Sequence, residues 1–131
     1  MILVDTSVLI DFFKGVKNEA SQKLRTLLQR GIPFGITSFI FQEVLQGAAS
    51  EKEYSVLDGY LRTQRFYYLK DPVGSFARAA RIYVNCRKKG ITVRSTIDCL
   101  IVQTALEHDL FLLHNDTDFT AIARVVPLKF Y

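Results

Sequence analysis

The sequence predicts an α/β fold, with a mainly parallel sheet of four or five strands flanked by helices on both faces. Short apolar runs, typical of strands buried on both faces, alternate along the chain with segments whose apolar residues recur at helical spacing. The 131 residues are 49% apolar and 23% charged, an ordinary composition for a folded protein with a substantial core. The sequence shows no repeat and no linker, so we expect a single domain over residues 1–131.

Each element of the first half follows from its local pattern. The runs ILVD and IPFGIT predict strands over residues 2–5 and 32–37. Apolar residues at helical spacing, with glycines beyond several of the ends, predict four helices, over residues 6–15, 17–30, 38–47 and 51–63. Ser38 is the expected N-cap of the third helix, because a hydroxyl can accept a hydrogen bond from a free N–H group of the first turn.

The second half continues the alternation of strands and helices. The runs RFYYL and LFLLHN predict strands over residues 65–69 and 110–115. Residues 125–130 predict a last strand, whose proline restricts it to an edge of the sheet. Between the strands, the pattern predicts helices over residues 72–88, 96–109 and 116–123.

A few acidic residues stand out from the rest. Thirteen acids are present, and most lie among polar neighbours on helices. An acid follows or interrupts an apolar run at four places, which hold Asp5, Glu43, Asp98, Asp116 and Asp118. Asp5, Asp116 and Asp98, the last residue of the capping-box pattern STID, have an alternative explanation as helix caps. Glu43 lies beyond the first turn of its helix, so its structural alternative is an ion pair with a lysine or arginine.

The predicted topology brings these acids toward one another. Asp5 and Asp116 both follow the carboxyl ends of parallel strands, and the helix that begins near Asp98 can point its N-terminus at the same edge. Carboxylates gathered in this way repel one another unless a cation lies between them. Oxygen-only ligands favour Mg²⁺ or Mn²⁺ over zinc, and such ions support hydrolysis or phosphoryl transfer. No P-loop motif is present, and a haloacid-dehalogenase-type phosphatase would need an aspartate where Ser7 stands.

Four segments in order resemble those of the PIN-domain ribonucleases and, within them, the VapC-type toxins of toxin–antitoxin pairs. They are LVDTSVLIDFF, FQEVLQG, STIDCLIVQTALEHD and LFLLHNDTDF, and the resemblance covers essentially the whole chain. It places the acidic quartet of the family on Asp5, Glu43, Asp98 and Asp116. Asp118 matches a fifth acid of many members, and Thr6 and Ser7 match the hydroxyl residues that support the first aspartate.

This resemblance implies a PIN-like fold and a Mg²⁺- or Mn²⁺-dependent endoribonuclease that hydrolyses RNA with a metal-activated water. Asp5, Asp98 and Asp116 are the implied metal ligands, with Asp118 as a further, outer one. Glu43 would hold a metal-bound water or a second ion. The implied partners are RNA, a cognate antitoxin protein and a second copy of the chain in a homodimer. The alternative is a non-catalytic module that contains a metal and binds RNA or a protein partner.

Several other residues have two interpretations. With 17 basic and 13 acidic residues the formal net charge is +4, which permits a polyanionic partner without requiring one. The densest basic segment is either an ordinary helix C-terminus or a site for RNA phosphates; it holds Arg87, Lys88, Lys89 and Arg94. The run RFYYL either stacks RNA bases or fills the core, and strand alternation favours burial of Phe66 and Tyr68 and leaves Tyr67 open.

The remaining expectations concern structural residues and surroundings. His108 and His114 are expected to be structural, because neither has a second histidine at metal-ligand spacing. Cys86 and Cys99 are expected as free thiols in a cytoplasmic protein, since the apolar run at the N-terminus is too short for a signal peptide or a membrane span. The apolar surface beside Glu43 is hypothesised to receive an antitoxin segment; it is formed by Phe39, Phe41, Val44 and Leu45.

Overall fold

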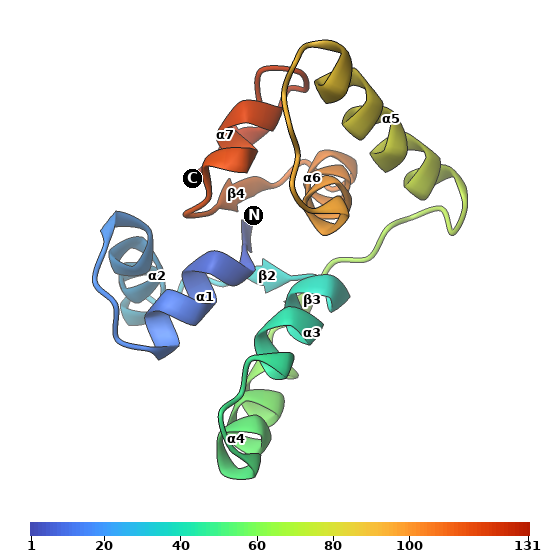
Figure 1. Ribbon diagram of the computed structural model, residues 1–131. Helices are drawn as coiled ribbons and strands as arrows, with labels where there is room; N and C mark the ends of the chain where they lie inside the picture. The colour runs from blue at the N-terminus through green and yellow to red at the C-terminus, as the bar shows by residue number, and fades with distance from the viewer.

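A five-stranded, fully parallel sheet forms the centre of the protein (Figure 1). The computed structural model describes residues 1–131. The strands are short, and their order across the sheet is β3-β2-β1-β4-β5, with every neighbouring pair parallel. They are β1 (Ile2–Val4), β2 (Gly35–Ile36), β3 (Arg65–Phe66), β4 (Phe111–Leu113) and β5 (Lys129–Phe130). The predicted parallel α/β fold, with its last strand at an edge, is confirmed.

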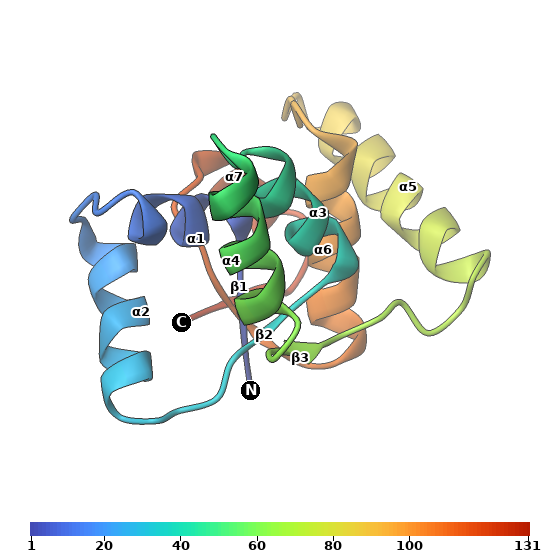
Figure 2. The same cartoon turned by 90° about the horizontal axis from the view of Figure 1, so that it is seen from below.

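Seven helices cover the two faces of the sheet. They are α1 (Thr6–Phe13), α2 (Glu19–Gln29), α3 (Ser38–Gln46), α4 (Glu51–Leu61), α5 (Gly74–Lys88), α6 (Thr96–Glu107) and α7 (Thr117–Ile122). Helices α1 to α4 lie on one face and α5 to α7 on the other, in front of and behind the strands in Figure 2. Right-handed crossovers produce this division, because the chain steps outward from β1 to β3 and then returns to β4 and β5 on the other side. None of the helices has the length and apolar character that crossing a membrane requires.

The strand order creates a crevice beside β1. The connection after β1 leads to β2 on one side, whereas the connection after β4 leads to β5 on the other, so the direction of winding reverses between β1 and β4. The backbone N–H of Asp5 donates to the carbonyl oxygen of Leu113 at 2.9 Å, which fixes the ends of these two strands side by side. Side chains that follow β1 and β4 therefore meet at the same edge of the sheet.

The core holds this edge rigid. Thirty buried apolar residues form one cluster, and the central strands β1 and β4 contribute Leu3, Val4 and Leu112, none of which is exposed. Ile101 and Val102 of helix α6 belong to the same cluster, and both side chains are fully buried. Burial of each such aliphatic side chain contributes about 1.5–3 kcal/mol to the stability of the fold, and this packing holds the strand ends in place.

Two local predictions were wrong. Tyr67 is buried, whereas Tyr68 is 62% exposed, because β3 ends at Phe66 and the chain no longer alternates between faces beyond it. The ring of Tyr67 instead lies over Gly35 in the neighbouring strand. The N-cap of α3 is Thr37, not Ser38: its backbone is extended and its hydroxyl accepts from the Ile40 N–H at 3.1 Å.

Gly35 is predicted to be indispensable for seating Tyr67. A Cβ at this position would overlap the Tyr67 ring, so Gly35→Ala should lower the free energy of unfolding by about 1–3 kcal/mol. The matched control is Gly59→Ala on α4, where a Cβ meets nothing within 4 Å and helix propensity should raise stability by about 0.5–1 kcal/mol. Urea unfolding of both variants measures this, and equal stabilities would contradict the packing described.

Candidate metal centre

A polar hollow of about 450 Å³ opens at the carboxyl ends of the strands. Segments far apart in the sequence line it: the starts of α1, α6 and α7, the middle of α3, and the loop before α6. Its lining residues are Asp5, Thr6, Ser7, Ile10, Glu43, Arg94, Ser95, Asp98, Asp116 and Asp118. All five acids singled out in the sequence, together with Thr6 and Ser7, therefore lie in one hollow.

Asp5 is the most deeply buried of these acids. It is the N-cap of α1, and its Oδ2 accepts from the Ser7 N–H at 3.0 Å and from the Ser7 hydroxyl at 2.6 Å. The Ser7 hydroxyl in turn accepts from the Asn115 N–H at 3.1 Å, which links the end of β4 to the start of α1. Burial raises the pKa of Asp5 even though the Ser7 bonds oppose it, and the nearby Asp116 charge adds to the rise. Asp5 is thus at once the N-cap of α1 and an acid of the hollow.

Glu43 is held by a hydroxyl group, without a cation. Its Oε1 accepts from the Thr6 hydroxyl at 2.8 Å, and none of the ion pairs in the structure includes it. The alternative of an ion pair with a lysine or arginine is therefore wrong. Burial raises the pKa of Glu43, the Thr6 bond opposes the rise, and the charge of Asp5 adds to it.

Asp98 is the least compensated acid of the hollow. The STID pattern does not form a capping box, because the Ser95 side chain makes no cap hydrogen bond. Asp98 lies in the first turn of α6, and its carboxylate takes part in none of the ion pairs of the structure. Burial, and then the negative charges of the four other acids, raise the pKa of Asp98 from 3.8 to about 7. Helix capping therefore does not explain this residue.

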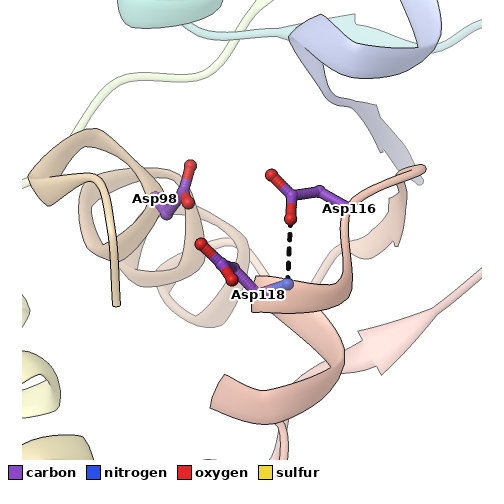
Figure 3. A group of neighbouring side chains, drawn as sticks. All are labelled: Asp98, Asp116 and Asp118. Atoms are coloured by element: carbon purple, nitrogen blue, oxygen red, sulfur yellow. Dashed lines mark hydrogen bonds between the residues drawn. The ribbon is translucent and has the colours of Figure 1, made fainter. Parts of the chain in front are cut away.

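Asp98, Asp116 and Asp118 converge on one point (Figure 3). One carboxylate oxygen from each lies within 4.8 Å of those from the other two. Asp116 is the N-cap of α7, and its Oδ1 accepts from the Asp118 N–H at 2.9 Å. The donors are hard oxygens without a histidine or cysteine, which is a set that suits Mg²⁺ or Mn²⁺. The residues present therefore fit a divalent cation.

Arg94 is the one basic side chain among these acids. Its Nε donates to Asp118 Oδ2 at 3.0 Å, and its Nη2 lies 3.5 Å from Asp116 Oδ1. The other three residues of the predicted basic segment do not line the hollow. Arg87 and Lys88 occupy the last turn of α5, and Lys89 is its C-cap. Of the four basic residues of this segment, Arg94 alone lines the hollow.

Two residues without a predicted role in the site support its acids. His114 Nδ1 accepts from the Asp116 N–H at 3.1 Å, and the imidazole packs against the rings of Phe119 and Phe130. The Asn115 N–H donates to the Ser7 hydroxyl that holds Asp5, while its side chain donates at 3.1 Å to Asp11, which lies outside the hollow. Their position directly after β4, at the carboxyl end of a strand, was the feature of the sequence that could have placed them beside the site. His108 is structural as predicted, with its Nε2 2.7 Å from the Tyr68 carbonyl oxygen.

The protein is thus a parallel α/β protein with a carboxylate-lined, metal-compatible hollow at the carboxyl ends of its strands. The family described as "PIN domain" matches residues 2–125. The chain therefore belongs to the PIN-domain family, as the sequence motifs implied.

Two curated relatives match almost the full length of the chain. They are the VapC ribonuclease Mb1587 of Mycobacterium bovis and ribonuclease VapC11 of Mycobacterium tuberculosis. Each is 33% identical over 130 residues, which is 98% of this chain and 96% of the relative.

Solved structures share the fold at lower identity. VapBC2 from Rickettsia felis, bound to a DNA fragment from its promoter, matches with a TM-score of 0.73 at 18% identity and covers 100% of this chain and 98% of that chain. VapBC-1 from nontypeable Haemophilus influenzae gives a TM-score of 0.73 at 17% identity, with 100% and 97% covered.

The uncompensated carboxylate predicts that Asp98→Asn stabilises the metal-free protein. A folded-state pKa near 7, above the ordinary 3.8, means that the folded state binds more protons than the unfolded state between these values. Stability is therefore lost as the pH rises through this window, and the loss is complete above it. Asparagine does not titrate, so the variant should gain about 1–2 kcal/mol at pH 8 and little at pH 4. Urea unfolding in EDTA at both pH values, with Asp58→Asn as the control, measures the gain.

Proposed function

We propose that this protein is a metal-dependent endoribonuclease of the VapC toxin type, which hydrolyses RNA phosphodiester bonds with water. Its membership of the PIN-domain family and its near full-length relatives, which are named as VapC ribonucleases, support this proposal. The observation that carries it is the placement of Asp98, which is half-buried and has no cap or ion-pair role, beside Asp116 and Asp118. Partial burial and the four neighbouring acids raise the pKa of this carboxylate to about 7, and a bound cation would relieve that strain.

The proposed cofactor is Mg²⁺ or Mn²⁺. Asp98, Asp116 and Asp5 would hold it, with Asp118 as an outer ligand, and the donor set of oxygens supports this choice. When bound, the cation supplies a water of lowered pKa and neutralises charge on the phosphate.

The side chains around the proposed ligands have positioning roles. The Ser7 N–H and hydroxyl fix Asp5 Oδ2, and the Thr6 hydroxyl fixes Glu43 Oε1. This leaves Glu43 Oε2 to orient the attacking water. Because burial raises the pKa of Glu43, its carboxylate is a better proton acceptor than an exposed glutamate. Ser7 and Thr6 would thus act through their acidic neighbours.

Asp98→Asn is predicted to abolish metal-dependent cleavage while the fold stays intact. Loss of one ligand of an oxygen-only site should lower activity at least about 100-fold. The measurement is cleavage of a labelled RNA in Mg²⁺, Mn²⁺ and EDTA, with sequencing of the new ends. Asp58→Asn on α4, an aspartate that pairs with Arg62 outside the hollow, is the matched control.

Two outcomes of this experiment count against the enzyme. Full activity of a well-folded Asp98→Asn protein would contradict the site assignment. Binding of RNA by the wild type in Mn²⁺ without any cleavage would favour the non-catalytic module instead.

The exposed basic residues at the end of α5 are the proposed contacts to RNA phosphates. Arg87, Lys88 and Lys89 all face solvent. The Asp98→Asn background is expected to bind RNA without cutting it. In this background, replacing Lys88 and Lys89 by alanine should reduce the slope of log affinity against log salt by about 1–2. Filter binding between 50 and about 200 mM salt measures the slope. An unchanged slope assigns these lysines to an ordinary helix C-terminus.

We further propose that a cognate antitoxin and a second copy of the chain are partners, and that the protein acts in the cytoplasm. Support for the antitoxin comes from solved relatives such as a toxin–antitoxin complex from Klebsiella pneumoniae, which has a TM-score of 0.69 at 24% identity and covers 98% of this chain and 99% of that chain. Of the apolar surface beside Glu43, Val44 and Leu45 are buried, whereas Phe39 and Phe41 remain half-buried. The antitoxin hypothesis for this surface is therefore limited to the two phenylalanines.

A further inference from the structure

The loop before α6 holds Arg94 in a defined place. Gly90, with a φ of +74°, ends α5 in the left-handed region that glycine favours. Beyond it the chain alternates: Ile91 and Val93 are buried, and Thr92 and Arg94 face outward. The two buried residues anchor the backbone, so the Arg94 side chain starts from a fixed point at the rim of the hollow.

The guanidinium group covers two of the three converging carboxylates. It contacts Asp118 Oδ2 at 3.0 Å and Asp116 Oδ1 at 3.5 Å. The Arg94 side chain is 69% exposed, against 31% for Asp116 and 12% for Asp118, so it lies on the solvent side of both. Asp116 and Asp118 are also two of the three residues whose oxygens lie within 4.8 Å of one another (Figure 3). The positive charge of Arg94 therefore lies beside the place that suits a divalent cation.

We propose that Arg94 is an internal competitor of the metal ion. Its guanidinium neutralises Asp116 and Asp118 in the metal-free protein and withdraws when a cation binds there. The inference rests on the metal site of the proposed function. Competition follows from charge, because two cations that share the same pair of carboxylates repel each other.

Replacement of the Arg94 guanidinium by a cation costs the fold little stability. Because the Arg94 side chain is mostly exposed, its withdrawal into solvent breaks two contacts and opens no cavity in the core. The pair of contacts relieves part of the repulsion among the acids while no metal is bound. The same contacts lower the apparent affinity for the metal, so the protein takes up a cation only when the cation outcompetes its own arginine.

The test uses Mn²⁺ alone, without RNA. Isothermal titration of Mn²⁺ into the wild type and into Arg94→Gln should give about two- to tenfold tighter binding by the variant, the range expected when a competing, partly exposed ion pair is removed. Arg87→Gln is the matched control: it removes the same charge from the same basic segment, outside the hollow. Its Mn²⁺ affinity should stay close to that of the wild type. The rise in Tm on adding Mn²⁺ should likewise be larger in Arg94→Gln, because tighter binding stabilises the folded state more.

The outcomes separate this inference from the proposed function. Equal Mn²⁺ affinity in the wild type and Arg94→Gln, or the same gain in Arg94→Gln and Arg87→Gln, overturns the competition and leaves the metal site in place. Weaker binding by Arg94→Gln overturns it as well, since the arginine would then assist the metal. Absence of Mn²⁺ binding by all three proteins overturns the metal site and the inference together.

Discussion

Five carboxylates share the edge at which the parallel strands end, and the repulsion among them is the constraint on which the rest of this edge depends. Most of the acids have a local partner that offsets part of it. Ser7 donates to Asp5, Thr6 to Glu43, and the first turn of α7 to Asp116. Asp98 has no such compensation, and burial together with its acidic neighbours raises its pKa to about 7. A divalent cation would relieve the repulsion that the protein itself leaves in place.

The topology brings the carboxylates together and also reduces the repulsion among them. Strands β1 and β4 end side by side at the reversal of winding, so the residues that follow them have to meet. The same geometry points the N-termini of α1, α6 and α7 at the hollow, and the partial positive charge of a helix N-terminus favours nearby anions. Helix capping and a metal site are therefore not exclusive here: Asp5 and Asp116 cap helices and line the hollow at once.

The sequence predicted the parts of the structure that local pattern and topology determine. The strand and helix order and the meeting of the five acids followed from apolar runs and from the rule that parallel strands end at one edge. Positions that depend on contacts between distant segments did not follow. Tyr67 is buried because Gly35 of a neighbouring strand leaves room for its ring, and nothing near Tyr67 in the sequence indicates this. Arg94 lies in a basic run, yet its partners are 22 and 24 residues further along the chain, as Asp116 and Asp118. The STID pattern failed for a related reason, since Ser95 lies in the hollow without capping its helix.

The role proposed for these carboxylates is to hold a divalent cation. Its most direct test is X-ray diffraction from crystals soaked in Mn²⁺, with data recorded at the manganese absorption edge. We expect an anomalous peak between Asp98, Asp116 and Asp118, within reach of Asp5. Manganese bound elsewhere on the protein, with no peak among these residues, would contradict it.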